Sequence, residues 1–157
     1  VGSPAQPLPA GGDGFTIDRR YYALDGTEVN VASVKQNDRF VVVLTVSEVN
    51  AWPSRVLVTD LLPAGFEIDN PRIVSSAELP NFSWLGATEY AHSEYRDDRF
   101  VAAFNRSGSD NRQFSFAYVV RATTPGVYAQ PAASVEDMYR PHLSARTATG
   151  RLEVSAN

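Results

Sequence analysis

Two stretches of the chain, residues 39–49 and 113–121, alternate apolar and more polar residues with a period of two. Successive side chains on a β-strand point to opposite faces, so this period predicts strands with one face buried in a core. The residues expected on the buried faces are Phe40, Val42, Leu44 and Val46 in the first stretch and Phe114, Phe116, Tyr118 and Val120 in the second.

Shorter runs rich in β-branched or aromatic residues predict further strands at 15–24, 55–60, 99–104, 126–128 and 152–155. Turn residues separate them, among them Asp25-Gly26, Pro63-Ala64-Gly65 and Thr124-Pro125-Gly126. Helical turns are expected only at 33–38 and 135–139. About seven to nine short strands joined by turns are typical of an all-β, two-sheet antiparallel β-sandwich of the immunoglobulin-like type.

Size and composition fit one domain of this kind. The 157 residues are 43% hydrophobic, include no cysteine and carry a formal charge of −4 with a single lysine, Lys35. The acidic balance disfavours a nucleic-acid groove, which needs a concentrated cationic face. The longest apolar runs are far shorter than the roughly 20 residues of a membrane-spanning helix. We expect residues 1–14, rich in Pro, Gly and Ala, to be an interdomain linker or partly artificial sequence, and residues 15–157 to be the domain.

No catalytic motif is found. His92 and His142 are the only histidines and lack metal-ligand spacing, so we interpret them as surface residues. Asp97 and Asp98 suit a solvated turn better than a calcium site. Asp60 and Asp69 flank a Leu-Leu-Pro-Ala-Gly turn, and we expect both to cap it through hydrogen bonds to the backbone. The sequence therefore predicts no enzyme activity, no cofactor and no metal site.

The aromatic residues leave two interpretations open. Trp52 and Trp84 lie in segments with loop composition, where partly exposed rings can become contact anchors. Rings of this kind could instead fill the edges of the sandwich, since large amphipathic side chains often pack there. If the two tryptophans are exposed and coplanar, they would favour a carbohydrate-binding or cell-surface adhesion module, which is the alternative function.

Several segments resemble the last macroglobulin-like domain of the bacterial alpha-2-macroglobulins. The most specific is Pro131-Ala132-Ala133-Ser134-Val135-Glu136-Asp137-Met138-Tyr139-Arg140-Pro141. Four earlier segments match in order, at residues 14–22 followed by Asp25-Gly26, at 38–46, at 62–71 and at 96–103. The resemblance covers almost the whole chain from Gly14 onward.

The resemblance implies a periplasmic, membrane-anchored protease inhibitor of broad specificity, in which a protease cuts a bait region and is then trapped, often by a thioester. The thioester needs a cysteine, so that chemistry must lie outside this chain. The last domain of the family is expected to pack against the thioester domain, to shield it from water, and to shift on activation. Its partners would be that domain and neighbouring macroglobulin-like domains, with target proteases involved only indirectly and no nucleic acid or inserted membrane.

The residues that we expect to make such interdomain contacts come partly from the resembling segments and partly from the aromatic loops. A phenol combines apolar area with one hydrogen bond, which suits an interface. Core packing remains the alternative for the tyrosines. The interface candidates are Tyr139, Asp137, Met138, Tyr21, Tyr22, Trp84 and Trp52.

Overall fold

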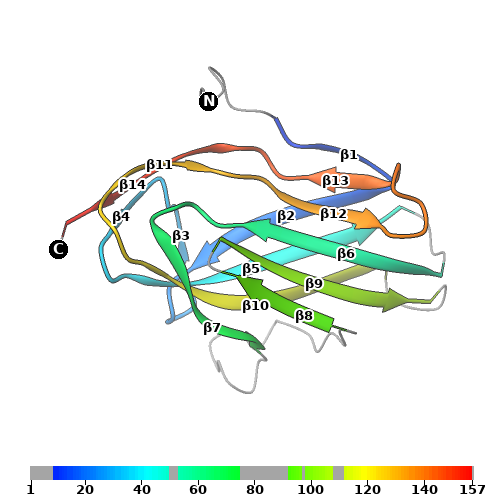
Figure 1. The fold of residues 1–157 in the computed structure, drawn as a ribbon, viewed down its shortest axis with the longest axis horizontal. Helices are drawn as coiled ribbons and strands as arrows, with labels where there is room; N and C mark the ends of the chain where they lie inside the picture. The colour runs from blue at the N-terminus through cyan, green and yellow to red at the C-terminus, as the bar shows by residue number, and fades with distance from the viewer. Residues whose placement is uncertain (1–8, 50–52, 75–91, 97, 108–111, 157) are drawn as a thin grey trace.

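The chain folds as a sandwich of two large β-sheets with a third, smaller sheet at one end (Figure 1). The computed structural model describes residues 9–49, 53–74, 92–96, 98–107 and 112–156. None of these residues forms a helix that could cross a membrane. The sandwich predicted from the alternating pattern is confirmed, and the third sheet was not anticipated.

The six-stranded sheet lies toward the reader in Figure 1 and has the order β1-β13-β12-β6-β9-β8. All its neighbouring strands are antiparallel. The strands are β1 (Gly11–Asp13), β13 (Ser144–Arg146), β12 (Ala133–Asp137), β6 (Ser54–Leu61), β9 (Arg99–Arg106) and β8 (His92–Arg96).

The five-stranded sheet, behind the first one, has the order β3-β2-β5-β10-β7 and is also antiparallel. The small sheet has the order β11-β14-β4, and its β14–β4 pair is parallel. The strands are β3 (Glu28–Val29), β2 (Phe15–Tyr22), β5 (Arg39–Glu48), β10 (Gln113–Ala122) and β7 (Phe66–Val74), followed by β11 (Gly126–Gln130), β14 (Gly150–Ser155) and β4 (Ser33–Lys35).

Aromatic rings from the two large sheets meet in the core. Phe100 on β9 stacks on Tyr118 of β10 with a centroid distance of 4.5 Å, and Phe104 of β9 packs against Phe114 and Phe116 at 4.9 and 5.0 Å. The inward rows predicted for β5 and β10 are all buried. Because such ring pairs bury large areas and add a geometric preference, they hold the sheets face to face.

A charged network lies inside this core. Arg19 of β2 and Asp60 of β6 occupy inward positions of opposite sheets, and Nη1 of Arg19 lies 2.5 Å from Oδ1 of Asp60. The hydroxyl of Tyr118 donates a hydrogen bond to Oδ2 of Asp60, and Nη2 of Arg19 donates to the carbonyl oxygen of Pro131 at 2.7 Å. Burial is the largest single influence on the Arg19 guanidinium and lowers its pKa, but attraction by Asp60 and a hydrogen bond to it, together with Tyr21 and Tyr118, raise the pKa overall.

Two local expectations are wrong. Residues 33–38 and 135–139 contain strands β4 and β12 in place of helical turns, because each pairs with a strand distant in the chain. Asp60 is not a turn cap, because its carboxylate pairs with Arg19 and accepts a hydrogen bond from Tyr118 in the core. Strand β1 lies inside the range 1–14 that the sequence predicts as a linker, and it is paired with β13.

The turn between β6 and β7 packs against a tyrosine. Gly65 lies so close to Tyr128 that a Cβ at this position would overlap the ring. The carbonyl oxygen of Gly65 also accepts a hydrogen bond from the Thr123 amide at 2.8 Å, and the Tyr128 hydroxyl lies 2.9 Å from the carbonyl oxygen of Thr124. These contacts join the β6–β7 turn to the β10–β11 turn at the end of the sandwich near the small sheet.

Replacing Gly65 by alanine should therefore destabilise the fold. We expect Gly65→Ala to lower the free energy of unfolding by about 1–3 kcal/mol, because Tyr128 must leave its place to admit the methyl group. Urea unfolding of the chain measures this difference. Tyr128→Ala should make the Gly65→Ala change nearly neutral, and an equal loss in both backgrounds would contradict the account.

The buried tyrosines should make stability fall at alkaline pH. Burial raises the pKa of Tyr21 to about 12 and raises the pKa of Tyr118 well above its ordinary value. In the unfolded chain both ionise near pH 10, so the native state binds more protons above that pH and stability declines toward pH 12. Urea unfolding at pH 8, 10 and 11 should show the decline. The variant Tyr21→Phe/Tyr118→Phe should show a shallower pH slope, whatever its stability at pH 8.

Candidate functional site

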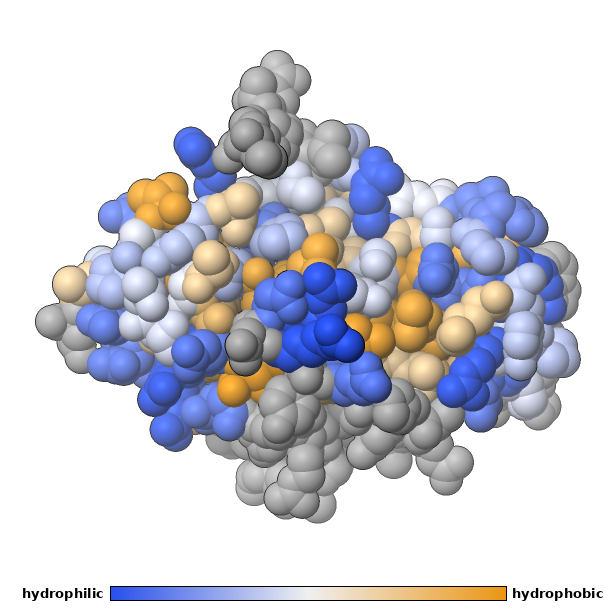
Figure 2. All heavy atoms as spheres, viewed as in Figure 1, coloured by the Kyte–Doolittle hydropathy of each residue, from blue (hydrophilic) through white to orange (hydrophobic). Residues whose placement is uncertain are grey.

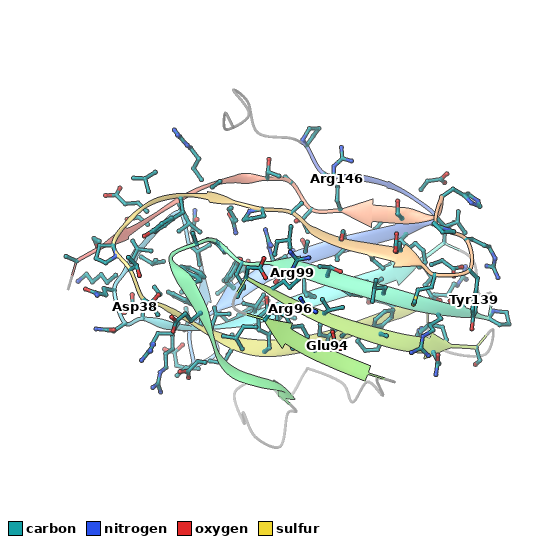
Figure 3. All side chains as sticks on the ribbon, viewed as in Figure 1. Asp38, Glu94, Arg96, Arg99, Tyr139 and Arg146 are labelled. Carbon is teal, nitrogen blue, oxygen red and sulfur yellow. The ribbon has the colours of Figure 1, made fainter. Side chains whose placement is uncertain are left out.

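The connection between β12 and β13 presents two exposed apolar side chains at the end of the sandwich opposite the small sheet (Figure 3). Met138 is 45% exposed and Tyr139 is 67% exposed. We call this pair the tip. Tyr139, labelled in Figure 3, lies at the extreme of the molecule's long axis. Exposed large apolar side chains are common singly, but two adjacent ones on an ordered turn are a candidate contact surface.

The buried carboxylate of Asp137 binds the turn that carries the tip. Asp137 ends β12 with its side chain 1% exposed. Its Oδ1 accepts a hydrogen bond from the Tyr139 amide at 2.9 Å, and its Oδ2 lies 3.2 Å from Nη1 of Arg140. Both oxygens therefore bind groups of the turn that carries the tip. Such a side-chain bond to the backbone two residues on is the geometry of an Asx turn.

Backbone hydrogen bonds close the turn around this carboxylate. The Asp137 amide donates to the carbonyl oxygen of Leu143 at 3.1 Å. The Arg140 amide donates to that of Asp137 at 3.1 Å, and the Leu143 amide donates to that of Arg140 at 2.8 Å. The turn is thus closed by its own backbone as well as by the carboxylate.

Neighbouring segments fix the turn from outside. The Met138 amide donates to the carbonyl oxygen of Arg55 at 2.8 Å, and Nη2 of Arg140 donates to that of Pro53 at 3.1 Å. On the other side, a Cβ at Gly14 would lie 2.9 Å from Cδ2 of Leu143, and the φ of Gly14 is +82°. Glycine is favoured there both by its backbone conformation and by this close approach.

A second buried ion pair lies at the same end of the sandwich. Nε of Arg106 at the end of β9 lies 3.0 Å from Oε1 of Glu48 at the end of β5, and both side chains are buried. The guanidinium of Arg106 also lies 4.4 Å from the ring centroid of Phe114. Because each charge is paired, neither is left uncompensated in the core beneath the tip.

Two of the other predicted interface residues, Tyr21 and Tyr22, do not join the tip. Tyr21 is buried in the core, where its hydroxyl accepts a hydrogen bond from Nε2 of Gln130 at 3.1 Å. Tyr22 is partly buried and packs on the outer face of the five-stranded sheet against a cluster that includes Val41 and Val43. Trp52 and Trp84 lie outside the described residues.

His142 is exposed on the same connection between β12 and β13 as the tip. Asp98 pairs with Arg99 at 3.0 Å on the surface, where Arg99 lowers the pKa of the Asp98 carboxyl. Asp69 pairs with Arg39 at 3.5 Å. Asp97 and the side chain of His92 lie outside the described part. Sequence reasoning missed exposed Val49, whose amide binds the carbonyl oxygen of Gly14 beside the tip.

The tip is suited to apolar contact. A cavity of about 10 Å³ beneath it, lined by Glu48, Asp137 and Arg140 among others, could hold about one water molecule.

Among the described residues there is no group of three or more His, Cys, Asp or Glu side chains that could hold a metal ion. On the outer face of the six-stranded sheet, apolar residues are interrupted by charged ones (Figure 2), including Arg96 and Arg99.

Comparison with known proteins finds relatives among the bacterial alpha-2-macroglobulins. An alpha-2-macroglobulin of Xylella fastidiosa is 35% identical over 160 residues, which cover 97% of this chain and 9% of that protein. The chain thus spans about a tenth of the length of this relative.

Solved structures agree. The native Escherichia coli alpha-2-macroglobulin fragment from domain MG7 to the C-terminus matches with a TM-score of 0.83 and 32% identity, covering 98% of this chain and 25% of that one. The trypsin-activated E. coli protein matches with a TM-score of 0.78 and 31% identity, covering 94% and 11%. The family model described as "Bacterial Alpha-2-macroglobulin MG10 domain" matches residues 14–142. The chain belongs to this family and is an MG10 domain of a bacterial alpha-2-macroglobulin.

Proposed function

We propose that this chain is the non-catalytic C-terminal domain of a periplasmic protease inhibitor of broad specificity, and that its tip docks on the thioester region of the same parent protein. The docked domain shields the thioester from water and amines, and it moves away after a protease cuts the bait region. The observation that carries the proposal is the exposed Met138–Tyr139 pair on a turn held by a buried carboxylate.

The energetics of docking favour a tip of this construction. An aromatic side chain that enters a desolvated pocket is the usual energetic centre of an interface. Ordering a loop on binding costs free energy, and a turn already fixed by Asp137, Arg55 and Pro53 avoids much of that cost. The thioether of Met138 adapts its shape to the surface it meets, and favourable contacts to aromatic rings are open to it.

A domain that docks and leaves must keep its own fold in both positions. This chain is similar to the native and to the trypsin-activated E. coli structures alike, which supports movement as one body. The contacts that hold the inactive state would then be made at the surface of the domain. This is the arrangement of a two-state interface in which only one state offers the favourable contacts.

The remaining parts of the proposal rest on the family. The partners would be the thioester domain and adjacent macroglobulin-like domains of the parent chain, and proteases would be met only indirectly. The parent would reside in the periplasm, anchored by a lipid at an N-terminus outside these 157 residues.

Tyr139→Ala in the full-length parent tests the shielding role. Methylamine attacks the thioester carbonyl and releases a thiol, so the rate of thiol release reports access to the bond. Losing one aromatic anchor costs an interface roughly 1–2 kcal/mol or more, which predicts a methylamine reaction faster by about tenfold. Val127→Ala removes another exposed apolar side chain, on β11 near the small sheet, and should leave the rate unchanged.

Two outcomes would defeat the proposal. One is an equal methylamine rate in the parent and in Tyr139→Ala. The other is a parent that releases no thiol at all with methylamine, because a shield then has nothing to protect.

A further inference from the structure

Both carboxylate oxygens of Asp137 bind groups of the turn that carries the tip. Oδ1 accepts from the Tyr139 amide and Oδ2 pairs with Arg140, while the side chain is 1% exposed. A side chain with so little exposed surface can make almost no contact with a neighbouring domain. Both of its oxygens bind groups of the turn itself, although Asp137 is next in sequence to Met138 and Tyr139 of the tip.

The two bonds differ in what they fix. The bond to the Tyr139 amide sets the backbone conformation at the residue that bears the exposed ring. The bond to Arg140 holds a guanidinium whose other arm reaches the carbonyl oxygen of Pro53, so it fastens the turn to the segment before β6. Without the carboxylate, the Tyr139 amide would lose its partner in the domain and turn to water, and the turn would sample other conformations.

We propose that Asp137 is a positioning residue for docking: it fixes the direction in which Tyr139 leaves the domain, and it touches no part of the neighbouring domain itself. This inference rests on the proposed function of the tip. Its physical basis is that a preorganised contact residue binds without an ordering cost, whereas a loose one must be ordered at the moment of contact. Loss of Asp137 therefore weakens docking through Tyr139 alone.

A double-mutant cycle on the full-length parent tests this mechanism. The four proteins are the parent, Asp137→Ala, Tyr139→Ala and the double variant, and the readout is again the rate of thiol release with methylamine. If Asp137 acts through Tyr139, Asp137→Ala speeds the reaction by several-fold up to about tenfold, and the double variant is no faster than Tyr139→Ala. Independent effects would instead multiply.

Two further variants separate positioning from stability. Asp137→Asn retains an oxygen that can accept from the Tyr139 amide but loses the charge that pairs with Arg140, so its rate should fall between those of the parent and of Asp137→Ala. Val120→Ala removes buried methyl groups from β10, far from the tip. It should lower the melting temperature and leave the methylamine rate unchanged.

Each contrary result has a distinct meaning. If Tyr139→Ala is fast and Asp137→Ala matches the parent, the positioning role is wrong and the docking role stands. The positioning role is also overturned if the rate increases of the two single variants multiply in the double variant. It is overturned as well if the full-length protein with Val120→Ala reacts with methylamine as fast as Asp137→Ala. Should Asp137→Ala fail to accumulate as folded protein, the same cycle with Asp137→Asn decides the question. A Tyr139→Ala parent with an unchanged rate refutes the proposed function itself.

Discussion

The ion pair between Arg19 and Asp60 is the constraint on which the arrangement of the sheets depends. The two charges face inward from opposite sheets, and each would be strongly destabilising alone, since breaking a buried pair costs about 3–5 kcal/mol. They must therefore meet, and Tyr118 completes the set. Because the two charges are buried together, the pair favours the alignment of the sheets in which Arg19 of β2 faces Asp60 of β6.

The same network reaches toward the tip. Arg19 also donates to the carbonyl oxygen of Pro131, two residues before β12 begins. Strand β12 then runs between β6 and β13 and ends at Asp137. The start of this strand is thus fixed by one buried charge and its end by another. Met138 and Tyr139 are therefore exposed at the end of a strand whose position is fixed from inside the sandwich.

The sequence could predict the elements that carry a local signal. The inward rows of β5 and β10 follow from strict alternation, and the Asp25-Gly26 turn follows from glycine, which has a φ of +94° at the β2–β3 hairpin. Strands β4 and β12 are short, and each is stabilised by pairing with a strand far along the chain, β14 and β6 respectively. The role of Asp60 was hidden for the same reason, because Arg19 is 41 positions away.

The candidate site was predictable in part. Met138 and Tyr139 were found through resemblance to a family, and composition would not have separated them from other apolar residues. The inward direction of Asp137 could have been read from alternation along β12, in which Val135 and Asp137 are buried and Ser134 is exposed. That its carboxylate binds the Tyr139 amide depends on a turn conformation that no period in the sequence encodes.

The proposed docking requires that the tip is covered in the intact parent and uncovered after activation. Met138 is the single methionine of these 157 residues, so methionine oxidation in a peptide from this domain is assigned to it. The most direct measurement is hydroxyl-radical footprinting of Met138 and Tyr139 by mass spectrometry, in the full-length parent before and after cleavage by trypsin. If the tip docks as proposed, both side chains are oxidised slowly in the intact protein and several-fold faster after cleavage. Equal rates in the two states would contradict the proposed docking.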